Sequence, residues 1–168
     1  FFFQADHGIR DQPRSRGLGD VYKRQPSNGF IDGTGQSVTL GSEATVDVFK
    51  SIDKAWAERD YETLKSLISN EGNFTHDDNS VSTNADEFVA HIEAGYQESL
   101  QNGEEWGWVT NFAFSVKPTK SETGDYANEN GEWVCARFTG SNGDVYEEWY
   151  QIVEGKLVMW SSAKRENK

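Results

Sequence analysis

The order of two hydrophobic patterns most constrains the fold of this chain. From Ser42 to about Leu100, apolar residues recur at helical spacing, and from Trp106 to Ser162 they alternate at period two. Helices that precede a run of strands, instead of alternating with them, are typical of an α+β domain with an antiparallel sheet. The sequence therefore predicts one α+β unit in which three N-terminal helices cover a face of the sheet.

Each expected helix begins at a residue suited to capping. Ser42 and Asp60 can accept a hydrogen bond from the first turn of a helix, and Asn84 with Glu87 three residues later forms a capping-box-like start. The expected helices cover residues 42–59, 61–69 and 84–100, with a short strand at 74–78.

Two turn signals predict how the last three strands pair. Asn142-Gly143 is typical of a two-residue hairpin loop, and Glu154-Gly155 is a second hairpin signal. Counting outward from these turns pairs Arg137 with Glu148, Cys135 with Tyr150, Trp149 with Trp160, and Glu147 with Ser162. One predicted face carries Trp133, Cys135, Arg137, Glu148, Tyr150, Ile152, Leu157 and Met159, and the other carries Val134, Ala136, Phe138, Glu147, Trp149, Gln151, Val158 and Trp160.

Both predicted faces are too apolar to remain in water, and three helices can cover only one of them. The second face then needs another partner. We expect a homodimer through the outer face, around Arg137, Glu148, Tyr150 and Met159.

The N-terminal segment, residues 1–25, resembles a translated sequencing adapter. Asp20 to Gln25 back-translates to gat gtg tat aag aga cag, which is similar to the mosaic end of a transposon-based library, and Gln4 to Asp11 is close to a flow-cell primer. Such scars are left out of fold reasoning. We therefore expect a metagenomic library fragment with its native N-terminus missing, a linker or N-terminal remnant at 26–42, and a folded domain at 43–168.

Charge and composition exclude several classes of partner. The chain has 28 acidic and 16 basic residues, and five of the basic residues lie in the adapter-like segment. So acidic a domain disfavours nucleic acid and anionic membranes, and no apolar run approaches the roughly 20 residues of a membrane span. Cys135 is the only cysteine, which excludes an internal disulfide and a thiolate metal cluster. Cytoplasmic and exported locations both stay open.

Together these segments resemble the nuclear transport factor 2-like superfamily, and within it the SnoaL-like domains that include ketosteroid isomerases and polyketide cyclases. The stretches AWAERDYETLKSLISNEGNFTHDD and WYQIVEGKLVMW carry the resemblance, which spans about Glu43 to Arg165. It implies a cone-shaped domain: a curved antiparallel sheet with the helices on its concave face and a pocket at the open end. These motifs specify a fold far better than an activity.

The resemblance also implies positions for a catalytic set. The general base of the isomerases falls on His76, with Asp77 beside it, and their catalytic tyrosine falls on Ile52. Their oxyanion-hole aspartic acid falls on Trp149 or Glu147, depending on the length of the hairpin. Because these positions lack the isomerase's hydrogen-bond donors, we expect no steroid isomerase chemistry.

His76 is the best single candidate for chemistry, since a histidine facing an apolar pocket can act as a base near neutral pH. Glu147 is expected near the pocket mouth, where desolvation would suit it to act as an acid. The structural alternative for both is an ordinary hydrogen-bonded or exposed side chain. A metal site from His76, Asp77, Asp78 and His91 lacks any recognised ligand spacing, and we expect neither metal nor cofactor.

Three functions remain open on the sequence. The first is a domain that binds a small apolar or aromatic molecule in a ring-lined pocket. The second is an isomerase, cyclase or hydrolase with His76 as base and Glu147 as acid, and the third is a structural or dimerisation module whose pocket is filled by its own side chains. The expected pocket residues are Trp56, Tyr96, Phe138, Trp149 and Trp160.

Overall fold

The computed structural model describes residues 29–31, 35–119 and 131–168, so the adapter-like segment 1–25 lies outside the described residues. The described chain forms three helices, α1 (Glu43–Ala57), α2 (Tyr61–Leu67) and α3 (Ala85–Asn102). It also forms eight strands: β1 (Gly29–Ile31), β2 (Gln36–Leu40), β3 (Ile68–Thr75), β4 (Val81–Ser82), β5 (Trp108–Pro118), β6 (Glu132–Gly140), β7 (Val145–Val153) and β8 (Lys156–Arg165).

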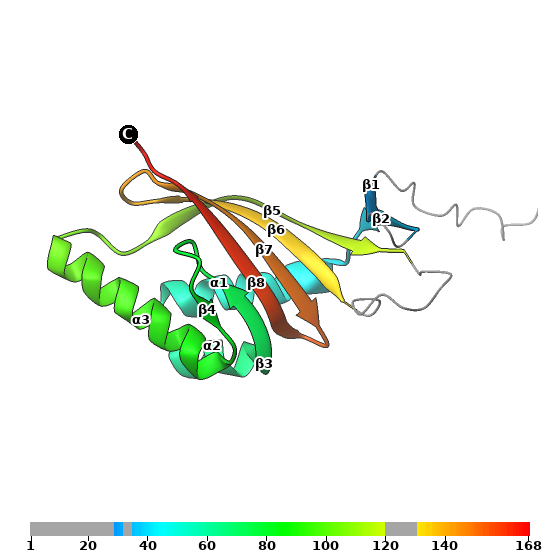
Figure 1. Cartoon of the computed structure of the whole chain (residues 1–168), viewed down its shortest axis with the longest axis horizontal. Helices are drawn as coiled ribbons and strands as arrows, with labels where there is room; N and C mark the ends of the chain where they lie inside the picture. The colour runs from blue at the N-terminus through cyan, green and yellow to red at the C-terminus, as the bar shows by residue number, and fades with distance from the viewer. Residues whose placement is uncertain (1–28, 32–34, 120–130) are drawn as a thin grey trace, which may run out of the picture.

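The strands form one curved, open sheet in the order β1-β2-β5-β6-β7-β8-β3-β4. Neighbouring strands are antiparallel except β3 and β8, which run parallel. All three helices lie against the same face of the sheet (Figure 1). The predicted α+β class, with helices on the concave face of a curved sheet, is confirmed. Within the described ranges, no helix is long and apolar enough to cross a membrane.

The expected caps position the first helix against the sheet. Ser42 accepts a hydrogen bond from the backbone N–H of Thr45, as a helix N-cap should. The backbone N–H and hydroxyl of Ser42 both donate to Oε2 of Glu132, at 2.6 and 2.8 Å, and the Thr45 hydroxyl donates to the same oxygen at 2.7 Å. These hydrogen bonds hold the pKa of Glu132 below its ordinary value against the opposing effect of burial. The start of α1 is thereby tied to β6.

The core lies between the helices and the sheet. Apolar side chains of the helices, spaced three or four residues apart, meet side chains that alternate along the central strands. Phe49, for example, contacts Phe138 and Tyr150 with ring centroids 6.2 and 5.0 Å apart. The fully buried side chains include Ile52, Leu64, Phe74, Phe88, Val134, Ala136 and Leu157.

The predicted pairing of β6 with β7 was wrong by one residue. The loop is not the two-residue Asn142-Gly143 turn but spans residues 140–144, with Thr139 paired to Val145. The backbone N–H of Gly140 donates to the carbonyl of Asp144 at 2.8 Å, and the amide of Asn142 lies within the loop, bonded to Asp144. This wider turn pairs Arg137 with Glu147.

The pairing of β7 with β8 begins as predicted and then shifts. Ile152 pairs with Leu157, but Gln151 pairs with Met159, so Val158 is left as an extra residue at a β-bulge. Beyond the bulge Trp160 lies opposite Tyr150. A bulge of this kind changes which side chains face inward farther along the strand.

The two shifts reverse the faces predicted for β7. Glu148 and Tyr150 point to the helices and are buried, so they do not belong to the outer face on which the dimer prediction placed them. Arg137 and Met159 do lie on that outer face, in register with Glu147 and Gln151. Because side chains alternate along a strand, a shift of one residue exchanges the two faces completely.

The sequence did not predict the short strands β1, β2 and β4. Residues 26–42 were expected to be a linker or N-terminal remnant, yet β1 and β2 lie there, and β2 pairs with β5. A strand was expected at 74–78. The observed strand, β3, begins earlier, at Ile68, and ends at Thr75, and the two-residue β4 follows it. The Gly- and Ser-rich composition of 26–42 hides β2, whose partner lies almost 80 residues away in the sequence.

Candidate functional site

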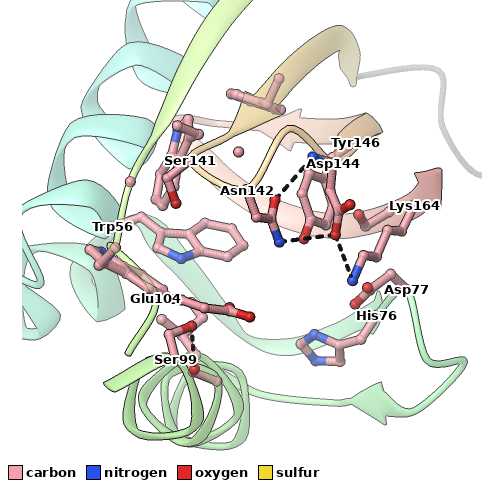
Figure 2. Close-up of a pocket in the computed structure, with 18 of the residues that line it drawn as sticks. Trp56, His76, Asp77, Ser99, Glu104, Ser141, Asn142, Asp144, Tyr146 and Lys164 are labelled. Carbon is pink, nitrogen blue, oxygen red and sulfur yellow. Dashed lines mark hydrogen bonds and ion pairs between the residues drawn. The ribbon is translucent and has the colours of Figure 1, made fainter. Parts of the chain in front are cut away.

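A cavity of about 740 Å³ opens between α3, the sheet and the β6–β7 hairpin. Figure 2 shows side chains converging on it from the helices, from the hairpin and from β8. Its lining includes Trp56 of α1, Gly95 and Ser99 of α3, Asn142 of the hairpin, and Lys164 of β8. A space of this size is in the range of small-molecule sites.

Aromatic rings form the deep wall of the cavity. Trp56 lies at their centre, with its ring centroid 5.6 Å from that of Trp160 and 6.0 Å from that of Trp108. Phe138 packs edge-on against Trp108 at 6.4 Å. These tilted and edge-to-face contacts fix the rings in place and leave apolar surface toward the cavity.

Glu148 is a buried carboxyl group in this wall. Its Oε2 accepts hydrogen bonds from the Tyr150 hydroxyl and, at 3.0 Å, from Nε1 of Trp160, and its Oε1 accepts from the Ser162 hydroxyl at 3.0 Å. Burial raises the pKa of Glu148 to about 7, although these three donors oppose the shift. The group can therefore hold or release a proton near neutral pH.

His76 lies on the other side of Trp160, just beyond the end of β3. Its ring centroid is 5.2 Å from that of Trp160 and 3.6 Å from that of His91 on α3, against which it stacks. The Nε2 atom shares a 2.8 Å hydrogen bond with the Ser82 hydroxyl. Burial, with a smaller effect of His91, lowers the pKa of His76 to about 4. The imidazole is thus neutral at physiological pH and free to accept a proton, but so low a pKa makes it a weaker base than the sequence led us to expect.

Polar side chains surround the mouth of the cavity. Lys164 donates to Oδ2 of Asp144 at 3.0 Å, and Asn142 donates to the same oxygen at 3.1 Å (Figure 2). The backbone N–H of Asn167 donates to the other oxygen of Asp144 at 2.9 Å. These hydrogen bonds lower the pKa of Asp144, so it stays ionised and fixes the hairpin against the C-terminal strand.

Asp53 places a further carboxylate on the cavity. It projects from α1 and accepts hydrogen bonds from Nε1 of Trp108 at 2.8 Å and from the Thr110 hydroxyl at 3.0 Å. Asp53 thereby joins α1 to β5 and orients one ring of the aromatic wall.

The described residues contain no group of three or more His, Cys, Asp or Glu side chains arranged to hold a metal ion. His91 lies on α3, and its ring stacks on that of His76. Parallel stacking at 3.6 Å differs from the arrangement in which two imidazoles point their nitrogens at one ion.

The structure brings together part of the predicted site. His76, Trp56, Phe138 and Trp160 line the cavity. Tyr96 lies behind the wall, where its ring packs on Trp106 and under the guanidinium of Arg59.

Two predicted site residues lie on the opposite face of the sheet. Trp149, 41% exposed, packs against Trp133, and Glu147 approaches Arg137 at 4.0 Å. Both were expected to point inward, and the shifted register explains the error.

Sequence reasoning missed Glu148, although it neighbours the predicted Glu147. In β7 a glutamate stands on each face, flanked by aromatic residues on both, so the alternation of the strand does not distinguish the faces. Asp53, His91 and Lys164 were also missed or set aside, because only the folded chain brings them beside the pocket.

No protein-family profile matches the sequence, and no curated protein matches it significantly. The similarity to known proteins lies in the structure. A SnoaL-like protein of unknown function from Burkholderia thailandensis superposes with a TM-score of 0.55 at 8% identity, covering 76% of this chain and 99% of its own. The chain has the nuclear transport factor 2-like fold.

Two further solved structures share this fold. A cystatin-like fold protein from Burkholderia xenovorans gives a TM-score of 0.54 at 12% identity, covering 80% of this chain and all of its own. A candidate ketosteroid isomerase from Kribbella flavida gives 0.52 at 10% identity, covering 77% and 83%. At such low identity, the nuclear transport factor 2-like likeness extends to the fold and not to an activity.

Proposed function

We propose that this nuclear transport factor 2-like domain binds a small, largely apolar molecule in the cavity between α3 and the sheet. The observation that carries the proposal is a space of about 740 Å³ with aromatic rings on one wall, which the side chains of the described residues do not fill. Apolar walls with a few polar groups are typical of small-molecule sites. Trp56, Phe138 and Trp160 supply the apolar wall, and the polar part of the lining includes Glu148 and His76 among many other polar and acidic side chains.

A substitution that fills the cavity tests this proposal. Gly95 faces the cavity from α3, and a Cβ atom there would meet nothing within 4 Å. Gly95→Phe should leave the fold intact and weaken binding of 2-phenylethanol, measured by tryptophan fluorescence, by about tenfold or more, the equivalent of 1.4 kcal/mol. Ala90→Phe, at an exposed position on the same helix, is the matched control and should change nothing.

Native mass spectrometry of the purified full chain provides a second readout. A small-molecule adduct on wild type that is lost in Gly95→Phe would support the binding function. If neither an adduct nor 2-phenylethanol binding is found, the domain is a structural module and the proposal fails.

An enzyme is the second candidate, because the cavity holds two groups suited to proton transfer. His76 is the neutral group that would act as base, and Glu148, not the outward-facing Glu147, would act as acid from the other side of Trp160. Trp160 links them, with its ring next to His76 and its Nε1 bonded to Glu148. In an isomerisation the base would take a proton from carbon while the acid protonates the carbonyl oxygen. His76 would then return its proton to another carbon as Glu148 takes its own back from the oxygen, which balances without a cofactor.

Exchange of α-protons of ketones in deuterated water, followed by NMR, tests the enzyme candidate. With a panel of cyclic ketones, His76→Ala should abolish exchange and Glu148→Gln should slow it by about 100-fold, a typical contribution of one general acid. Glu147→Gln should have no effect. Equal exchange in wild type and His76→Ala would exclude this mechanism.

The exposed apolar residues of the outer face support a homodimer. Phe112 and Phe114 stack on each other on β5, both 44% exposed, and Trp149 lies exposed on β7. We expect a dimer through this surface, which differs from the predicted one by the loss of Glu148 and Tyr150 and the gain of Trp149. Light scattering at micromolar concentration should give twice the chain mass, and Phe112→Asp combined with Phe114→Asp should give the monomer. A monomeric wild type would contradict the dimer.

A further inference from the structure

We propose that the ligand of this cavity is an organic cation: a small amine with an apolar body, whose ammonium group lies beside Glu148. This inference rests on the proposed binding function and narrows its ligand class. It combines three features of one cavity: its charge, its aromatic rings and the unused bonding capacity of its buried polar atoms.

Acidic side chains far outnumber basic ones in the lining of this cavity. Among the described residues that line it, nine are carboxylic acids and a single one, Lys164, is a lysine or arginine. That ammonium is already paired with Asp144 at 3.0 Å. His76 adds no positive charge, because its pKa lies far below neutrality. An anionic ligand would meet this field without a free counter-charge, whereas a cation is attracted by it.

The aromatic rings suit the same kind of ligand. The face of an indole or phenol attracts a cation, most strongly where water is excluded. Trp56, Trp160 and Tyr146 all line the cavity. The apolar body of an amine can pack on the same rings, so one wall serves both parts of the molecule.

Glu148 is the carboxyl group best placed to receive the ammonium. Oε2 accepts from both Tyr150 and Trp160, whereas Oε1 accepts from Ser162 alone among the described residues. A carboxylate oxygen can accept about two hydrogen bonds, so Oε1 keeps one position for a ligand. A bound ammonium would also supply the counter-charge that this buried carboxylate lacks.

A buried indole N–H independently points to an occupant. Trp106 lines the cavity, and its Nε1 is buried with no hydrogen-bond partner in the described structure. An unpaired buried donor costs about 1–3 kcal/mol. An ammonium cannot accept this hydrogen bond, so the N–H points to a ligand whose body also carries an acceptor, and it bears on occupancy of the cavity and not on the charge of the ligand.

Three probes of similar size and different charge test the inference on the full chain. Phenethylammonium, 2-phenylethanol and 3-phenylpropionate are titrated at pH 8 and about 0.15 M salt, where the screening length is about 8 Å. We expect the ammonium to bind at least tenfold more tightly than the alcohol, a difference of about 1.4 kcal/mol, and the carboxylate more weakly than either.

Two variants then test whether Glu148 is the group that holds the ammonium. Glu148→Gln should weaken ammonium binding at least about fivefold, or about 1 kcal/mol, and leave the alcohol within twofold. Glu147→Gln removes one negative charge from the outer face of the same strand and should change neither. If Glu148→Gln leaves ammonium binding unchanged, the proposed position of the cation is wrong.

The outcomes separate this inference from the function on which it rests. Equal affinity for the ammonium and the alcohol overturns the cation class and leaves small-molecule binding intact. Absence of binding by all three probes overturns both. Tighter binding of 3-phenylpropionate would show that the field of the cavity is not what selects the ligand.

Discussion

Glu147 and Glu148 are neighbours on β7 with opposite environments. The side chain of Glu147 is 66% exposed and approaches Arg137 on the outer face, whereas Glu148 is buried in the cavity among three hydrogen-bond donors. Burial raises the pKa of Glu148 to about 7. Two identical side chains thus differ in burial because side chains alternate between the two faces along a strand. The register of one hairpin decides which of the two glutamates faces the site.

The largest difference in the free energy of unfolding between substitutions on the two faces should come from their tryptophans. Trp160 is 3% exposed and Trp149 is 41% exposed. Trp160→Ala should lower the free energy of unfolding by about 3–5 kcal/mol, because it leaves a cavity in the core. Trp149→Ala should cost about 1 kcal/mol or less in the monomer. Urea unfolding measures both, and similar losses would contradict the assignment of the faces.

The two glutamates should also differ in how stability depends on pH. The pKa of Glu148 rises from 4.5 to about 7 on folding, so between these values the folded chain keeps a proton that the unfolded chain has released. Stability should therefore fall as the pH rises through this window, by about 3 kcal/mol in all, and level off above it.

Urea unfolding of wild type and of Glu148→Gln at pH 5 and pH 8 measures this loss as the change in the difference between the two proteins, because His76 titrates in the same range in both. The difference should change by about 3 kcal/mol, because the amide does not titrate, and Glu147→Gln should follow wild type. A difference that is the same at both pH values would show that Glu148 ionises freely in the fold.

His76 should give an effect of similar size and opposite sign. Its pKa falls from 6.5 to about 4 on folding, mainly through burial, so the folded chain resists protonation and loses stability as the pH falls through this range, by about 3 kcal/mol in all. NMR of the imidazole nitrogens should show a neutral ring at pH 5.5. A titration near pH 6.5 would mean that His76 is in contact with water.

The smallest effect is expected on the outer face. Arg137 and Glu147 form a long, partly exposed ion pair at 4.0 Å. Such pairs contribute about 0.5 kcal/mol or less, so in the monomeric Phe112→Asp/Phe114→Asp background Arg137→Ala should leave the unfolding midpoint almost unchanged. A loss of several kcal/mol would show that this face is covered, which would favour the dimer.

The sequence predicted the helices well because their signals are local. Ser42, Asp60 and Asn84 each cap the helix that was expected to follow them. A cap needs only the residues of the next turn, and an amphipathic stripe needs only its own spacing. The class of fold followed from these elements and from the alternating strands after them.

The site was only partly predictable, because strand pairing depends on contacts between distant residues. His76, Trp56, Phe138 and Trp160 were expected at the pocket and line it. Glu147 and Trp149 were expected there and face away, since a five-residue turn replaced the two-residue turn that Asn142-Gly143 suggested. That turn is bonded to Lys164 and Asn167 through Asp144, which no local pattern reveals.

The sequence by itself determined an acidic α+β domain with three capped helices, a run of antiparallel strands and an aromatic interior. Only the tertiary structure decided that Glu148 faces the cavity, that His76 stacks on His91, and that a cavity lies between α3, the sheet and the β6–β7 hairpin. The physical reason is the same in each case. Helices and caps arise from neighbours in the chain, whereas register, burial and cavities arise from how distant segments pack.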